Sequence, residues 1–129
     1  MKTRKPRSKG FTLIELLIVL AIIALLLTIA VPSYFASLDN AKETSLKQSL
    51  SVMRTAIDHY KGDLGKYPET LQTLVDAKYL RSLPADPITG ATDQWAVETG
   101  GEPGQPSGVK DVHSGAPGNG KDGTPYATW

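Results

Sequence analysis

The sequence contains no cysteine among its 129 residues, so no disulfide can stabilise the protein. Small exported domains often depend on disulfides, which means that an exported domain here needs another source of stability. The length is sufficient for one small domain with its own core and a membrane anchor, but not for two such domains.

Acidic residues are absent from the first ten positions, where five basic residues are concentrated. They are Lys2, Arg4, Lys5, Arg7 and Lys9. Without this segment, nine basic residues face 13 acidic ones, a net charge of −4. A nucleic-acid-binding domain needs clustered basic charge, so no nucleic-acid partner is expected. The basic segment instead predicts a cytoplasmic N-terminus by the positive-inside rule.

Strongly polar residues are almost absent from Phe11 to Val31, where Glu15 is the one exception. Such a run is long enough to span a bilayer core as a helix. A secretory signal peptide is the alternative, since it also has a basic start and an apolar middle. The run is long for a signal peptide and lacks a convincing small-x-small cleavage site, so we expect it to remain as an anchor.

Glu15 is a carboxylate near the start of this apolar run. A charge at the centre of a lipid-facing helix costs about 2.5–3.5 kcal/mol, and less toward an end, so such residues indicate function and a nearby partner. The segment contains no basic residue. Cleavage after Gly10 would free an amino group at Phe11, which could pair with Glu15 of another copy of the chain.

The segment Gly10-Phe11-Thr12-Leu13-Ile14-Glu15, followed by the apolar run and Pro32, resembles the class III signal of type IV pilins and type II secretion pseudopilins. The resemblance implies that a membrane-bound prepilin peptidase cleaves between Gly10 and Phe11 and methylates the Phe11 amine. It also implies that Glu15 is an assembly residue in a homopolymer. The expected organisation is a leader at 1–10, a transmembrane and assembly helix at 11–31, and a periplasmic pseudopilin domain at 32–129.

Beyond the anchor, the pattern predicts an α+β fold of the pilin type. Apolar residues at spacings of three and four predict an amphipathic helix that ends between residues 61 and 65, while Pro32 predicts a bend or a loosened turn at 29–32. The segment Tyr67-Pro68-Glu69-Thr70 is expected to start a shorter helix, with Pro68 in its first turn. Strands are expected at 93–99 and 109–114, joined by a glycine-rich loop in a small antiparallel sheet that packs on the amphipathic helix.

The segment from Lys66 to Pro87 resembles the corresponding region of the major pseudopilin of type II secretion systems. This implies a subunit of an inner-membrane-anchored periplasmic filament that drives or guides cargo export, working with other pseudopilins and an inner-membrane assembly platform. The alternative is a type IV pilin for adhesion, motility or DNA uptake. A further alternative is a single-pass anchored binding module that never polymerises, but it leaves Glu15 unexplained.

The C-terminal segment is glycine-dense from Ser114 to Thr124, and we expect the bulky Trp129 to dock it onto the domain. In major pseudopilins a loop at this place binds calcium, which favours six to eight oxygen ligands. The resemblance carries Ser114 and Asp122 over as ligands, with Asn119 and Asp111 as weaker candidates. Asp122 is the only acid of this loop, so a plain glycine-rich turn is the open alternative.

An enzyme is not predicted. His59 and His113 lack an accompanying cysteine, a serine nucleophile in a suitable setting or an acidic dyad. The neighbouring pair His113-Ser114 cannot form a catalytic triad by adjacency alone, because a nucleophile, a base and an orienting acid need convergent geometry.

Overall fold

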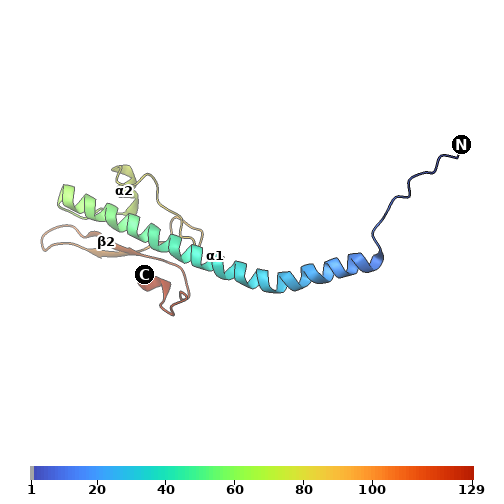
Figure 1. Ribbon diagram of the computed structural model, residues 1–129. Helices are drawn as coiled ribbons and strands as arrows, with labels where there is room; N and C mark the ends of the chain where they lie inside the picture. Colours follow the sequence, from blue (N-terminus) through green and yellow to red (C-terminus); the bar gives the residue numbers. More distant parts are fainter. Residues whose placement is uncertain (1) are drawn as a thin grey trace. The chain divides into compact units, whose positions relative to one another are not determined.

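The computed structural model describes residues 2–129 and has an α+β fold, as predicted (Figure 1). A long helix α1 (Leu13–Leu64) is followed by a short helix α2 (Leu71–Asp76), strands β1 (Ala96–Gly100) and β2 (Gly108–His113), and the 3₁₀ turn η1 (Tyr126–Thr128). The chain divides into two compact units, Met1–Leu38 and Asp39–Trp129.

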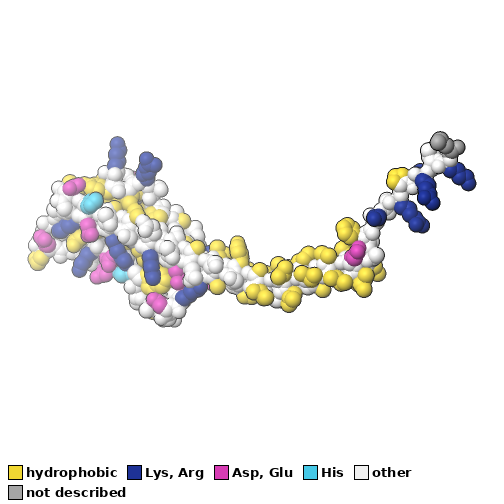
Figure 2. Space-filling view, viewed as in Figure 1, with side chains coloured by type: hydrophobic (Ala, Val, Ile, Leu, Met, Phe, Trp, Pro, Cys, Tyr) yellow, Lys and Arg dark blue, Asp and Glu magenta, His cyan; other side chains and the backbone are white. Residues whose placement is uncertain are grey.

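In the first unit, apolar side chains cover the face of α1 that Figure 2 shows. Every large apolar side chain from Phe11 to Phe35 is exposed in the chain, and α1 is long and apolar enough to cross a membrane. An exposed apolar surface of this extent marks a membrane-facing or protein-facing segment. In the isolated chain nothing covers it among the residues that the structure describes.

The predicted loosening at 29–32 is not observed, because α1 is helical through Pro32. Proline cannot donate a backbone hydrogen bond to the residue four positions earlier, Thr28. The Thr28 hydroxyl donates to the carbonyl of Leu25 (2.6 Å), so this side chain is bonded within the helix. Pro32 therefore lies inside α1, with helical residues on both sides of it.

In the second unit, the predicted amphipathic stripe of α1 forms the centre of the core. Its buried members are Leu46, Leu50, Met53, Ala56, Ile57 and Tyr60. Burying a side chain of this size stabilises the fold by about 1.5–3 kcal/mol, so the stripe fixes which face of the helix turns inward. The helix ends at Leu64, where Gly65 adopts a positive φ of 71° that favours glycine.

Helix α2 begins with a capping box formed by two threonines. The Thr70 hydroxyl accepts from the Thr73 backbone N–H, and the Thr73 hydroxyl accepts from the Thr70 backbone N–H. This arrangement satisfies two otherwise unpaired donors at the start of the helix. Pro68 therefore lies before the helix, not in its first turn as the sequence suggested, and it is buried.

Strands β1 and β2 form an antiparallel hairpin in which Glu98 pairs with Asp111 and Thr99 pairs with Val109. The register shift between these pairs is a bulge that leaves Lys110 between them. Both Val109 and Val112 are consequently buried against the α1 stripe. The prediction of a small sheet packed on the amphipathic helix is confirmed.

Candidate assembly site and C-terminal tail

Glu15 forms a capping box with Thr12 at the start of α1. The Glu15 carboxylate accepts from the Thr12 backbone N–H at 3.0 Å, and the Thr12 hydroxyl accepts from the Glu15 backbone N–H at 3.2 Å. The sequence shows no basic residue in this segment but did not predict this local hydrogen bond. Among residues 2–129 Glu15 forms no ion pair, so its local partner is a backbone dipole and its charge remains uncompensated.

Gly10 and Phe11 lie before the helix, in an exposed and extended segment. Phe11 is 93% exposed, and a Cβ added at Gly10 would meet nothing within 4 Å. Nothing among residues 2–129 therefore requires glycine at position 10. A requirement for glycine must come from a partner that approaches the backbone closely, such as a peptidase cleft.

Ser114 is buried, and it donates a hydrogen bond to the carboxylate of the buried Asp86 at 2.6 Å. Its hydroxyl also accepts from the Ala116 backbone N–H at 3.1 Å. The other oxygen of Asp86 accepts from the backbone N–H of Ile88 at 2.8 Å. The pair thus links the turn after Pro84 to the end of β2.

Asp122 forms no hydrogen bond to Ser114 or Asp86 among the described residues. It is exposed, and its Oδ1 accepts from both the backbone N–H and the hydroxyl of Thr124, at 3.0 and 2.6 Å. The hydrogen bond from the Thr124 hydroxyl is the main reason that the pKa of Asp122 lies below its ordinary value. Thr124 Oγ1 in turn accepts from the Trp129 indole N–H at 2.7 Å.

Glu43 of α1 anchors the tail to the helix. Its Oε1 accepts from the backbone N–H of Lys121 at 2.8 Å and from the Tyr126 hydroxyl at 3.2 Å. Burial, followed by the hydrogen bond to Glu43, raises the pKa of Tyr126. The Nζ of Lys47 lies 4.6 Å from the centre of the Trp129 ring, a cation–π contact that adds to the docking.

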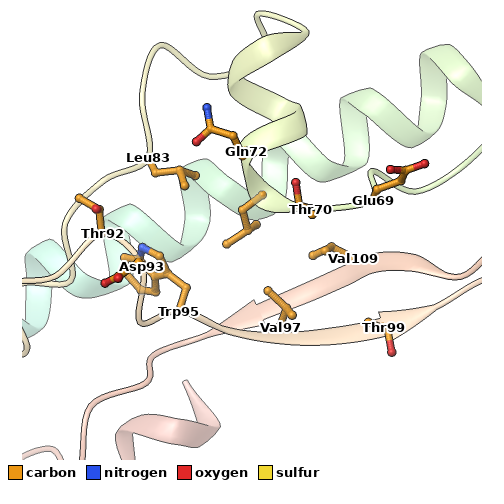
Figure 3. A pocket seen from close by; sticks show the side chains of 11 residues that line it. Glu69, Thr70, Gln72, Leu83, Thr92, Asp93, Trp95, Val97, Thr99 and Val109 are labelled. Atoms are coloured by element: carbon orange, nitrogen blue, oxygen red, sulfur yellow. The ribbon is translucent and has the colours of Figure 1, made fainter.

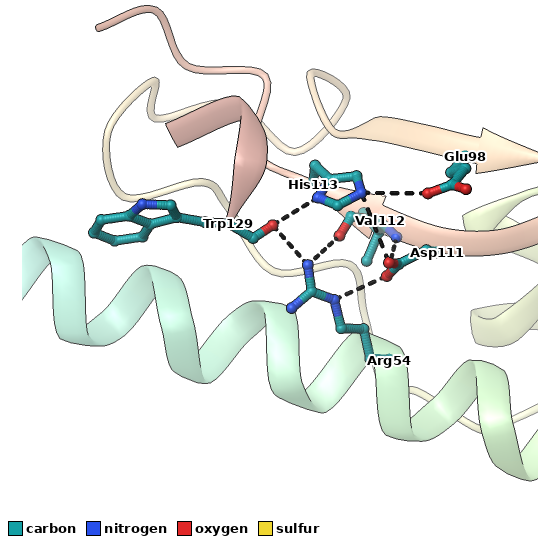
Figure 4. Close-up of polar contacts among 6 residues, drawn as sticks. All are labelled: Arg54, Glu98, Asp111, Val112, His113 and Trp129. Atoms are coloured by element: carbon teal, nitrogen blue, oxygen red, sulfur yellow. Dashed lines mark hydrogen bonds and ion pairs between the residues drawn. The ribbon is translucent and has the colours of Figure 1, made fainter. Parts of the chain in front are cut away.

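Arg54 of α1 joins the helix, β2 and the tail (Figure 4). Its Nε donates to Asp111 Oδ1 at 2.9 Å, and its Nη2 donates to the main-chain oxygens of Val112 and Trp129 at 2.8 and 2.6 Å. Burial opposes ionisation of Asp111, but the Val112 N–H and the Arg54 charge outweigh it and lower the pKa of that carboxyl. The predicted docking of Trp129 is confirmed.

A pocket of about 270 Å³ opens between α2 and the hairpin (Figure 3). Trp95, Val97 and Val109 supply most of the apolar side chains that line it on the hairpin side, and Thr70 and Gln72 line the α2 side. Trp95 is fixed there because its indole N–H donates to the Pro84 carbonyl at 2.9 Å. The lining carries no convergent set of titratable groups that would indicate catalysis.

Comparison with known proteins identifies the family. Residues 5–31 match the family described as the prokaryotic N-terminal methylation motif. Type II secretion system core protein G of Klebsiella michiganensis is 29% identical over 135 residues, covering 92% of this chain and 93% of that protein. Its namesake in Klebsiella pneumoniae is 33% identical, covering 63% of this chain and 69% of that protein. The chain belongs to the type II secretion system core protein G family.

The match to pilins is narrower than the match to the core protein G family. The type IV major pilin protein PilA of Myxococcus xanthus is 38% identical over 64 residues, which are 50% of this chain but only 29% of that pilin. No solved structure matches the chain significantly. The predicted resemblance to the major pseudopilins is therefore confirmed at the level of the family.

Three residues of this site were not singled out by the sequence: Asp86, Glu43 and Arg54. An aspartate before a proline, as at Asp86, is typical of a turn, but its hydrogen bond with the buried Ser114 joins residues 28 positions apart. Glu43 and Arg54 are charged residues on the helix that face the tail across 78 and 75 positions of sequence. Local patterns carry no signal for contacts at such separations.

Proposed function

We propose that the chain is the structural subunit of a periplasmic pseudopilus in a type II secretion system, and that it acts mechanically instead of catalytically. The observation that carries the proposal is the exposed apolar stretch of α1, which begins with the capped but electrostatically uncompensated Glu15. Such a surface needs lipid before assembly and neighbouring subunits after it. Membership of the core protein G family supports the same role.

Assembly follows from a charge pair between subunits. Cleavage after Gly10 frees the Phe11 amine, which stays protonatable when methylated and carries a positive charge. Leaving one charge unpaired in a dry helix bundle costs about 3–5 kcal/mol, so the packing offset that places Glu15 by the Phe11 amine of the next copy is favoured. This contact joins two different surfaces and, when the rotation does not close, builds a filament.

The proposed location is the bacterial inner membrane, with a single span. The five basic residues before the apolar run keep the N-terminus cytoplasmic and place the C-terminal domain in the periplasm. The proposed partners are further copies of this chain, other pseudopilins, the assembly platform and the prepilin peptidase. The filament drives or guides cargo outward.

The Gly10→Ala variant is expected to remain in the membrane as uncleaved precursor. The added methyl group meets no atom of residues 2–129 within 4 Å, so a loss of processing would reflect exclusion from the peptidase cleft and not misfolding. Co-expression with a prepilin peptidase, followed by intact-mass measurement, checks both the removal of residues 1–10 and the methylation of Phe11. Ser8→Ala, in the same exposed segment, is the neighbouring control and is expected to be processed normally.

The residues carried over as calcium ligands do not fit a calcium ion as they are folded here. Ser114 Oγ is buried between Asp86 and the Ala116 N–H, whereas Asp122 is exposed and bonded to Thr124. The loop has one acid, and Lys47 lies close enough to Asp122 to contribute to its lowered pKa. Calcium sites in proteins gather several carboxylate and carbonyl oxygens around one point. We therefore propose that direct contacts through Glu43 and Arg54 close the tail in place of calcium.

Calcium at millimolar concentration is accordingly expected to leave the thermal unfolding midpoint within about 1 °C of its value in chelator. A ligand at 100 times its Kd would add about 2.7 kcal/mol, which is roughly 10–20 °C for a domain of this size. The full chain in detergent, scanned with calcium, magnesium and chelator, makes the comparison. A calcium-specific rise of several degrees that Asp122→Asn abolishes would contradict closure without the metal.

A further inference from the structure

Two carboxylates and one imidazole lie close together on the hairpin (Figure 4). Glu98 of β1 is paired directly with Asp111 of β2, and His113 follows two residues later on the same strand. One ligand atom from each of the three side chains lies within 4.8 Å of the other two. Like charges directly opposite one another across a hairpin are destabilising, and Arg54, which pairs with Asp111, offsets only one of these two charges.

His113 is oriented as a metal-ligating histidine is. Its Nδ1 lies 2.7 Å from the main-chain oxygen of Trp129, a contact that requires the proton on Nδ1. A hydrogen bond of this kind fixes the tautomer and leaves the Nε2 lone pair available. That lone pair faces Glu98 Oε2 at 3.6 Å and Asp111 Oδ2 at 3.7 Å, which is too long for a good hydrogen bond to either.

These separations are close to those of two ligands on one zinc ion. With metal–ligand distances of about 2.0–2.2 Å and tetrahedral angles, ligand atoms lie about 3.3–3.6 Å apart. Of the two Nε2-to-carboxylate distances, the one to Glu98 lies at the upper end of this range and the one to Asp111 is about 0.1 Å longer, while all three ligand atoms lie within 4.8 Å of one another. Glu98 is exposed and has no hydrogen bond to another side chain among residues 2–129, so it is free to close the remaining gap.

Asp111 is held so that one oxygen remains available. Its Oδ1 accepts from the Arg54 Nε and from the Val112 N–H, at 2.9 and 2.8 Å, while Oδ2 is directed to His113. The charge of Arg54 offsets one of the two carboxylates, so the site carries a net charge of −1 with neutral imidazole. A bound divalent ion would change the net charge of the site from −1 to +1, so neither state carries a large charge.

We propose that Glu98, Asp111 and His113 form a binding site for a zinc-type transition-metal ion, with a water molecule at the fourth position. Imidazole favours zinc and its neighbours over calcium or magnesium, which prefer sites made of oxygen alone. A bound ion would connect β1 to β2 directly and, through the His113–Trp129 contact, hold the docked tail. The site is separate from the Glu15 assembly residue and does not depend on the proposed filament function.

Zinc titration of the full chain in detergent, followed by calorimetry, tests the site. One equivalent is expected to bind. Glu98→Gln removes one ligand oxygen charge from an exposed side chain without disturbing the core, and it is expected to weaken binding at least tenfold. His59→Gln is the matched control, because His59 is the other histidine of the sequence and is exposed on α1. Its zinc affinity should equal that of the unmodified chain.

The absorption spectrum of bound Co²⁺ gives a second measurement, which changes only when a residue that coordinates the metal is replaced. Tetrahedral coordination by this site should give visible absorption bands with Co²⁺ that Glu98→Gln and His113→Gln alter and His59→Gln leaves unchanged. Absence of binding at 100 µM zinc would overturn the proposal. Equal affinity of Glu98→Gln and the unmodified chain, or loss of binding in His59→Gln, would overturn it as well.

Discussion

Replacing Glu15 with valine is expected to abolish filament assembly while leaving membrane insertion and cleavage after Gly10 intact. Valine removes the uncompensated charge, and insertion into lipid becomes more favourable without it. The variant also loses the capping box with Thr12, which costs about 1 kcal/mol at the helix start. Electron microscopy of filaments, with intact-mass measurement of the membrane-bound subunit, checks both halves of the expectation.

The Glu15→Gln variant separates the two contributions of this side chain. Glutamine keeps an oxygen that accepts from the Thr12 backbone N–H, so the capping box survives, but the charge is gone. If pairing with the Phe11 amine drives assembly, Glu15→Gln fails to form filaments as completely as Glu15→Val does. Normal filaments from Glu15→Gln would assign the residue to helix capping and remove the intersubunit charge pair from the mechanism.

The fold could be read from the sequence wherever the information is local. The period of three and four in Leu46, Leu50, Met53 and Ile57 predicted the buried face of α1, because a helix repeats on that spacing. The end of α1 at Gly65 followed from the conformational freedom of glycine. The hairpin was predicted from two alternating segments around a glycine-rich loop, although the bulge that turns both Val109 and Val112 inward was not.

The C-terminal tail shows why the rest could not be predicted. Its composition indicates flexibility, yet Gly115 and Gly120 are needed for close approach and not for mobility. A Cβ at Gly115 would overlap the Gln94 carbonyl oxygen, and one at Gly120 would overlap the Trp129 ring. The partners lie in other segments, and their positions follow only from the packed fold. For the same reason the hydrogen bond that Ser114 donates to Asp86 could not be predicted, and the sequence suggested Ser114 only as a calcium ligand.

Replacing Asp86 with alanine is expected to destabilise the unit formed by residues 39–129 by about 3–5 kcal/mol. Asp86 is fully buried, and its two oxygens accept from the Ile88 N–H and the Ser114 hydroxyl. Alanine leaves both donors without an acceptor in a place that water does not reach, and an unsatisfied buried donor costs about 1–3 kcal/mol. Thermal or urea unfolding of the full chain in detergent measures the loss. Asp93→Ala, at an exposed acid seven residues away, is the matched control and should change stability by less than about 0.5 kcal/mol.

A double-mutant cycle with Ser114→Ala tests whether Asp86 acts through the predicted contact. Ser114→Ala alone removes one donor to a buried carboxylate and is expected to cost about 1–3 kcal/mol. The double variant should lose less than the sum of the two single losses, because the Ser114 donor is already unsatisfied in Asp86→Ala, and coupling between contacting residues is typically about 0.5–3 kcal/mol. Additive losses would mean that the turn after Pro84 and the end of β2 are stabilised independently. Coupling would establish that a buried carboxylate and a serine, in a domain without cysteine, perform the cross-linking that a disulfide performs in many exported domains.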